Sequence, residues 1–167
     1  VSFSATSLSL SSISTPKTLP THRCGRTFLT SLGRMLSLRH ISVSDMDNNC
    51  YLLCSEGQGL LIDAAANAPE LLAMADDAGV KITAVLTTHR HHDHTRALKE
   101  VLGATGAKHY APFLDAPAIP APADVELNDG DTIEFAGHSL PVTILRGHTP
   151  GGACLAAEID GLSLIHI

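Results

Sequence analysis

The stretch THRHHDHT, residues 88–95, decides how this sequence is interpreted. It follows an apolar run, residues 82–87, that is typical of a buried strand, and it leads into a helical pattern over residues 95–102. Four potential metal ligands fall within six positions of this strand-to-helix connection: His89, His91, Asp93 and His94. The stretch is therefore our first candidate for a functional site.

The spacing of these ligands indicates two metal ions. His89 and His91 are two residues apart, so they cannot share one face of an α-helix, but they can converge from a loop at a strand end. Asp93 and His94 are adjacent and are expected to point toward a second ion. Imidazole and carboxylate ligands suit zinc, with iron, manganese or cobalt as chemically reasonable substitutes.

Two further features favour a metal site over the alternative of a solvated histidine-rich turn. His148 lies in RGHTPGG, residues 146–152, where glycines permit the backbone conformations that could aim a ligand at a shared centre. Asp63 ends the apolar strand pattern of residues 59–63, in the way expected of a carboxylate that orients a ligand histidine.

The surrounding pattern predicts a mixed α/β fold. Strands and helices alternate in the first part, which favours a mixed or parallel sheet covered by helices. The expected strands are residues 36–42, 49–54, 59–63, 82–87 and 108–111, and the expected helices run from Pro69 to a stop at Gly79 and over residues 95–102. A proline-rich loop, residues 116–123, separates these from three further strands, residues 132–135, 140–145 and 153–159.

Composition restricts the partners. Of the 167 residues 44% are hydrophobic, which is enough for one sizeable core. The sequence has no continuous apolar run of 18 residues or more, the length expected of a membrane span. A net charge of -6 argues against nucleic acid and anionic membranes, so we expect a small-molecule substrate. Four irregularly spaced cysteines favour buried thiols in a reducing compartment, the cytoplasm, over disulfides or a zinc knuckle. The sequence does not define an oligomeric state.

Charge and composition also divide the chain. Residues 1–34 carry a charge of +4 without an acidic residue, and the first methionine is Met35. We predict that residues 1–34 are a non-native or disordered leader, with an organellar transit peptide as the alternative. The end, LSLIHI at residues 162–167, resembles the translation of a sequencing-library adapter. Residues 35–161 are thus predicted to be a domain truncated at its C-terminal end.

Within residues 35–161 the chain resembles the metallo-β-lactamase superfamily, and among its branches the glyoxalase II type thioester hydrolases. The motif His-x-His-x-Asp-His is matched by residues 89–94, and GHTPG at residues 147–151 matches the family's next ligand loop. LID at residues 61–63 resembles its opening strand, and DGD at residues 129–131 the turn before its later strands. The resemblance implies a four-layer αββα sandwich, here with an incomplete second half.

The resemblance also implies the roles of the ligands. His89, His91 and His148 would hold a first zinc ion, and Asp93 and His94 would help hold a second, with Asp93 also orienting the attacking water. The family's bridging aspartate and last histidine have no counterpart before Gly161, which is expected of a truncated chain. Thr95 and Arg96 stand where glyoxalase II proteins often have two glycines, so the thiol carrier of the substrate stays open.

The implied function is zinc-dependent hydrolysis of a hydroxyacylglutathione-type thioester by water activated on the metal. The alternatives are a persulfide dioxygenase of the same fold with one iron ion, and an inactive truncated fragment. A β-lactamase or a nuclease is less favoured, the nuclease because the chain has no basic patch. Four other histidines are expected to have structural or surface roles: His40, His92, His109 and His138.

Overall fold

The computed structural model describes residues 35–159 and 162–166, so the predicted leader, residues 1–34, lies outside the described residues. The described strands form two sheets. The six-stranded sheet has the order β1 (Ser37–Val43), β2 (Asn48–Ser55), β3 (Gln58–Ile62), β4 (Lys81–Leu86), β5 (Lys108–Pro112) and β6 (Val125–Leu127). The four-stranded sheet has the order β10 (Leu162–His166), β9 (Gly152–Ile159), β8 (His138–Leu145) and β7 (Thr132–Phe135).

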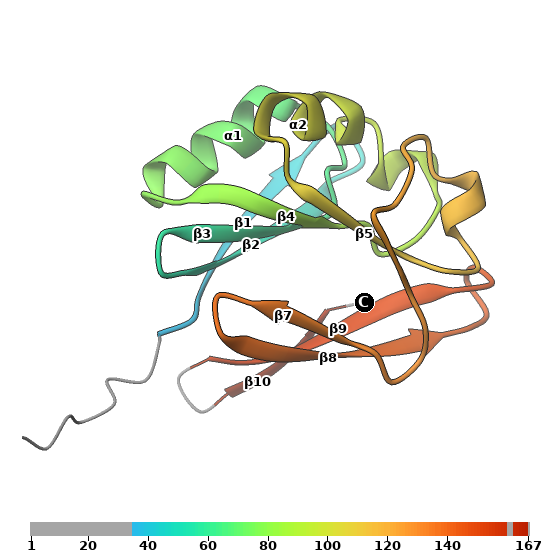
Figure 1. The fold of residues 1–167 in the computed structure, drawn as a ribbon. Helices are drawn as coiled ribbons and strands as arrows, with labels where there is room; N and C mark the ends of the chain where they lie inside the picture. The colour runs from blue at the N-terminus through green and yellow to red at the C-terminus, as the bar shows by residue number, and fades with distance from the viewer. Residues whose placement is uncertain (1–34, 160–161, 167) are drawn as a thin grey trace, which may run out of the picture. The chain divides into compact units, whose positions relative to one another are not determined.

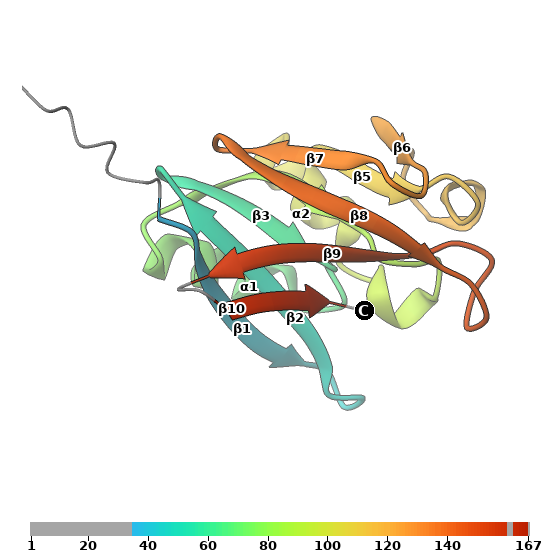
Figure 2. The ribbon, with the colours of Figure 1, turned by 90° about the horizontal axis from the view of Figure 1, so that it is seen from below.

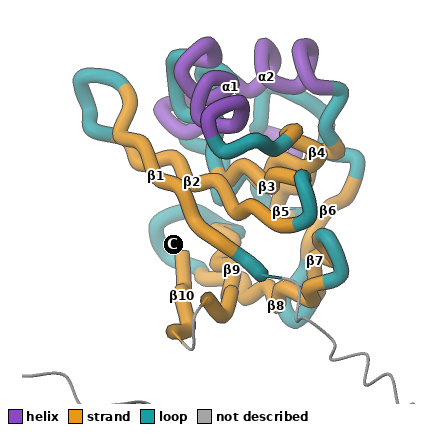
Figure 3. The backbone as a smooth tube through the Cα atoms, turned by 90° about the vertical axis from the view of Figure 1, so that its left-hand side faces the viewer, coloured by secondary structure: helices purple, strands orange, loops and turns teal. Residues whose placement is uncertain are grey.

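The first sheet is mixed, because β1 to β3 pair antiparallel while β3 to β6 pair parallel. Parallel neighbours need a crossover connection. The helices α1 (Ala68–Asp77) and α2 (Leu98–Thr105) provide the crossovers from β3 to β4 and from β4 to β5. Both helices cover one face of this sheet, and the four-stranded sheet lies on the other (Figures 1 and 3). The mixed α/β prediction is confirmed.

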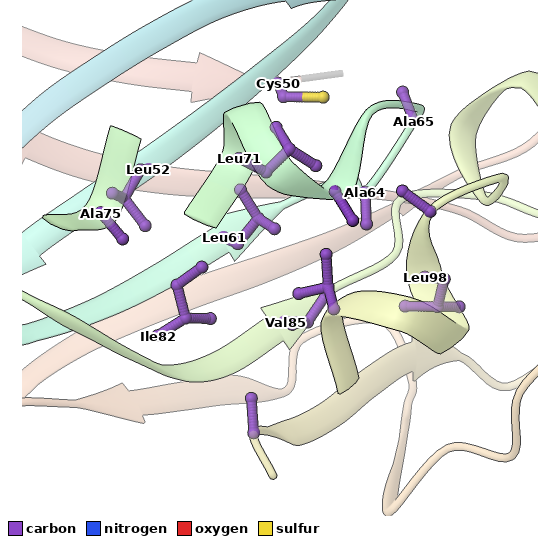
Figure 4. Close-up of a cluster of buried hydrophobic side chains, with 14 of the residues drawn as sticks. Cys50, Leu52, Leu61, Ala64, Ala65, Leu71, Ala75, Ile82, Val85 and Leu98 are labelled. Atoms are coloured by element: carbon purple, nitrogen blue, oxygen red, sulfur yellow. The ribbon is translucent and has the colours of Figure 1, made fainter. Parts of the chain in front are cut away.

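Side chains of the central strands alternate between two hydrophobic cores. Leu61 and Val85 point toward the helices and pack in one core with Leu71 of α1 and Leu98 of α2 (Figure 4). Their strand neighbours face the second sheet and join a core between the sheets, which includes Leu60, Leu86, Ile133, Phe135 and Val142. In Figure 2 the second sheet is seen in front of the first. Burial on both faces explains the apolar character of β3 and β4.

The boundaries of α1 follow the local signals in the sequence. Asn67 caps the helix with a left-handed backbone, Pro69 lies in its first turn, and Leu71 and Ala75 are buried. Gly79 has φ +68°, a conformation in which glycine carries no steric penalty, and it follows the last helical turn. The predicted stop at Gly79 is confirmed.

Other elements differ from the prediction. The helix expected from Thr95 begins only at Leu98, because residues 92–94 form a short 3₁₀ helix, η1 (His92–His94), and Thr95 caps it with φ -131°. Strand β6 was not predicted, since three residues are too few to show alternation. Strand β10, which pairs with β9, lies in the segment predicted to be an adapter-derived tail. The origin of that segment stays a prediction.

Candidate metal centre

The candidate ligands meet at one edge of the two sheets. Strands β3 and β4 are parallel, so their carboxyl ends lie side by side and bring Asp63 next to residues 87–94. The loop between β8 and β9, residues 146–151, contributes His148. The N–H of Ala153 donates to the Thr88 carbonyl at 2.7 Å, so a backbone hydrogen bond joins the second sheet to the start of the histidine loop.

Three histidines from these two loops converge. The ring centroids of His89, His91 and His148 lie 4.5 to 5.0 Å apart, and one ring nitrogen from each lies within 4.8 Å of the others. Nε2 of His89 is 3.1 Å from Nδ1 of His91. Three imidazole nitrogens directed at one point are a donor set suited to a transition metal.

Asp63 lies beneath this group and contacts a fourth histidine. Its fully buried carboxylate accepts hydrogen bonds from the Thr88 N–H at Oδ1 and from the Thr88 hydroxyl at Oδ2, both at 2.7 Å. Oδ2 is also 2.7 Å from Nδ1 of His94. Asp63, His89 and His94 form a second group that could hold a metal, but the oxygens of Asp63 are already engaged. Asp63 therefore lies where it can orient His94.

The contact with Asp63 defines the state of the His94 ring. A carboxylate only accepts, so Nδ1 of His94 carries the proton and donates it to Asp63, which leaves Nε2 with a free lone pair when the ring is neutral. The same hydrogen bond raises the pKa of His94 against the opposing effect of burial. Nε2 of His94 is 3.6 Å from Oδ2 of Asp93, so the two side chains face one another.

The side chain of Asp93 is held by Asn48, the first residue of β2. Oδ2 of Asp93 accepts a hydrogen bond from the side-chain amide of Asn48 at 2.9 Å, and the amide oxygen of Asn48 accepts from Ser44 and from Arg96. Partial burial would raise the pKa of Asp93, but the bond from Asn48 and the nearby histidines hold it below its usual value. Arg96, one of the departures from the glyoxalase II pattern, thus ties the turn between β1 and β2 to the candidate site.

His89 is the most buried of the candidate histidine ligands, with 8% of its surface exposed. Burial, and next the proximity of His94, lower the pKa of His89 to about 4. At neutral pH the ring is therefore uncharged, which is the form in which imidazole binds a metal.

A cavity of about 410 Å³ adjoins the histidines. Its walls combine His89, His94 and His148 with the apolar Leu145 and the cationic Arg146. The site can therefore admit a small molecule beside the candidate ligands.

Among the described residues, the groups that could hold a metal include no other histidine and no cysteine. His92 is exposed, His40 lies in β1, His109 is buried in β5, and His138 is the first residue of β8. The described cysteines, Cys50, Cys54 and Cys154, are buried and unpaired, as predicted for strand cysteines.

Two residues near the site were missed by the sequence analysis. Asn48 holds Asp93, and Asp115 accepts hydrogen bonds from the backbones of both histidine loops. A polar residue at the start of an apolar strand was a signal for Asn48, whereas the Asp-Ala-Pro of residues 115–117 indicates only a loop. Among the residues that the structure describes, no helix is long and apolar enough to cross a membrane.

The chain belongs to the metallo-beta-lactamase superfamily, whose family model matches residues 43–162. Among curated proteins it is 38% identical over 125 residues to the hydroxyacylglutathione hydrolase of Fuscovulum blasticum, covering 70% of this chain and 48% of that protein. It is 36% identical over 121 residues to the enzyme of the same name from Maricaulis maris (strain MCS10), covering 71% and 46%. The chain therefore spans about half the length of these relatives.

Solved structures share the fold. The BLEG-1 B3 metallo-beta-lactamase superposes with a TM-score of 0.63 at 20% identity, over 71% of this chain and 66% of that chain. The class B3 di-zinc metallo-beta-lactamase LRA-12, from an Alaskan soil metagenome, gives a TM-score of 0.61 at 26% identity, over 70% and 54%.

Proposed function

We propose that this protein is a zinc-dependent hydrolase that cleaves thioesters of the hydroxyacylglutathione type. The observation that carries the proposal is the convergence of His89, His91 and His148 from two separate loops. The names of the curated relatives support the thioester as substrate, and the likeness to LRA-12, a di-zinc enzyme, supports the metal.

One distance between candidate donors is compatible with zinc. Two nitrogens bound to one tetrahedral zinc ion at about 2.0–2.1 Å lie roughly 3.3–3.4 Å apart. Nε2 of His89 and Nδ1 of His91 are 3.1 Å apart, so a small adjustment of either ring suffices. Imidazole and carboxylate donors also suit iron or manganese, so the choice of zinc is part of the proposal.

Each ligand has a role in the proposed centre. His89, His91 and His148 would hold one ion, while Asp93 and His94 would help hold a second. When bound, zinc supplies an activated water and polarises the acyl carbonyl of the substrate. Asp63 keeps the proton of His94 on Nδ1, which leaves Nε2 free, and Asn48 fixes the Asp93 carboxylate so that it can orient the attacking water.

The cavity accounts for substrate entry. The acyl group of a small thioester would lie beside His94 and His148 against the apolar wall at Leu145. Unpaired buried cysteines are compatible with a reducing compartment, so we propose that the enzyme acts in the cytoplasm.

The test is a thioesterase assay on the zinc-loaded protein. We expect hydrolysis of a 2-hydroxyacyl thioester of glutathione, monitored by release of the free thiol, and loss of zinc and activity in His89→Ala. The exposed His92→Ala is the matched control. Stoichiometric zinc without hydrolysis would contradict the proposal and favour an inactive fragment, while bound iron with oxygen consumption would favour the dioxygenase.

A further inference from the structure

We propose that Asp115 is a positioning residue for the metal centre. Its carboxylate fixes the relative position of the two histidine loops, residues 87–94 and residues 146–151. Asp115 lies in the loop after β5, directly before the 3₁₀ helix η2 (Ala116–Ala118), and its surface is fully buried. This inference rests on the proposed metal site, because it assigns a function to a residue that supports the ligands.

Each oxygen of Asp115 contacts a different loop. Oδ2 accepts a hydrogen bond from the N–H of Arg90 at 3.0 Å, and Arg90 lies between His89 and His91. Oδ1 accepts from the N–H of Gly151 at 3.1 Å, three residues after His148. Within residues 35–159, no other carboxylate accepts hydrogen bonds from both loops.

The backbone around Asp115 is fixed as well. Its N–H donates to the Pro112 carbonyl at 3.0 Å, and its own carbonyl accepts from the Ala118 N–H at 2.9 Å. These bonds limit the movement of the carboxylate, so it acts as a rigid reference point for both loops.

Gly151 permits this close approach. A Cβ atom added to Gly151 would lie 2.8 Å from Cβ of Leu114, a distance that real Cβ atoms essentially never show. The absence of a side chain at Gly151 therefore lets the segment carrying Asp115 pack directly against the loop of His148. Two separate features, the hydrogen bond to the buried carboxylate and the glycine contact, therefore hold the loop of His148 against the segment that carries Asp115.

Positioning of this kind affects metal affinity. The histidines come from two sheets, so their mutual distances depend on the relative placement of the loops. Removing a partner that orients metal ligands typically weakens metal binding about 10- to 100-fold. We expect Asp115 to contribute an effect of this size.

The substitution Asp115→Asn tests the proposal with little change in volume. An asparagine side chain has a single acceptor oxygen, and its amide nitrogen cannot accept from a backbone N–H. One of the two loops therefore loses its partner. Zinc affinity is measured on the full chain by competition with a chromophoric chelator, and we expect it to fall about 10- to 100-fold.

Two variants separate positioning from general destabilisation. Asp124 accepts from the His109 N–H through one oxygen, so in Asp124→Asn the amide oxygen can preserve that bond, and affinity should not change. Ile133→Val creates a small defect in the core between the sheets, away from both loops, and should lower the melting temperature without changing zinc affinity.

The absorption spectrum of the cobalt-substituted protein reports ligand geometry directly. We expect the d–d bands to change in Asp115→Asn and to match those of the unaltered chain in both controls. Wild-type zinc affinity in Asp115→Asn, or an equal loss in Ile133→Val, would overturn the inference while leaving the proposed metal centre intact. Absence of zinc binding in the unaltered chain would overturn both.

Discussion

Replacing Asp63 by asparagine should move the proton of a neighbouring histidine. Oδ1 of Asp63 accepts from the Thr88 N–H, which can only donate, so the amide oxygen of the asparagine must occupy that side. Its amide NH₂ group then faces Nδ1 of His94, which must accept instead of donate. The proton of His94 is therefore expected on Nε2, the nitrogen that faces Asp93 and the proposed second ion.

The magnitude follows from replacing two charge-assisted hydrogen bonds by neutral ones. In the unaltered chain Oδ2 of the fully buried Asp63 carboxylate accepts from the Thr88 hydroxyl and from Nδ1 of His94. A hydrogen bond to a charged group contributes about 1.5–3 kcal/mol to stability and a neutral one about 0.5–1.5 kcal/mol, so each replacement costs about 1 kcal/mol. A loss of about 2 kcal/mol should lower the melting temperature of the metal-free chain by about 4–8 °C. The amide oxygen keeps the bond to the Thr88 N–H, so a larger loss is not expected.

Long-range ¹H–¹⁵N NMR of the metal-free chain, at a pH where histidine is neutral, identifies the protonated nitrogen of His94. The matched control is Asp129→Asn, because Asp129 accepts from the Ile144 N–H through one oxygen that the amide can replace. The orienting role of Asp63 would be refuted if His94 kept its proton on Nδ1 in Asp63→Asn and the variant had the same melting temperature as the unaltered chain.

Three further predictions concern the site, the pH dependence and the core. His148→Ala should abolish tight zinc binding in a chelator competition, whereas the exposed His92→Ala should bind like the unaltered chain. Burial lowers the pKa of His109 below its usual value of 6.5, so as pH falls below 6.5 the unfolded state binds protons that the folded state resists, and stability declines. Urea unfolding should show that the free energy of unfolding declines with falling pH in the unaltered chain, and declines less in His109→Asn. Equal declines in the two chains would contradict this reasoning. Leu71→Ala, at a fully buried position, should cost about 2–5 kcal/mol in the same assay without altering the convergence of the histidines.

The sequence predicted the parts of the fold that local chemistry determines. The buried strands, the helix between Pro69 and Gly79, and the loops that carry the candidate ligands follow from apolar runs that end in polar or glycine residues. These signals lie within a few residues of the feature that they predict. The same holds for His89 and His91, whose spacing excludes a shared helical face.

Other features depend on contacts that a single stretch of sequence does not reveal. The late start of α2 follows from the 3₁₀ turn η1, in which the Thr95 hydroxyl lies within hydrogen-bond distance of the His91 and His92 carbonyls. Strand β6 exists because its three residues pair with β5, in register with Tyr110 to Pro112. In both cases a tertiary or medium-range partner overrides the local pattern.

Asp115 shows why supporting residues escape a motif search. Its partners, Arg90 and Gly151, lie 25 and 36 residues away in opposite directions along the chain, and they contribute backbone N–H groups that any non-proline residue could supply. The hydrogen bonds themselves therefore leave no signal in the sequence, and the glycine at 151 shows its importance only through the close approach of Leu114. Metal ligands are identified by their own chemistry, whereas the residues that set the distances between ligands are identified by where the fold brings the backbone, and this requires coordinates.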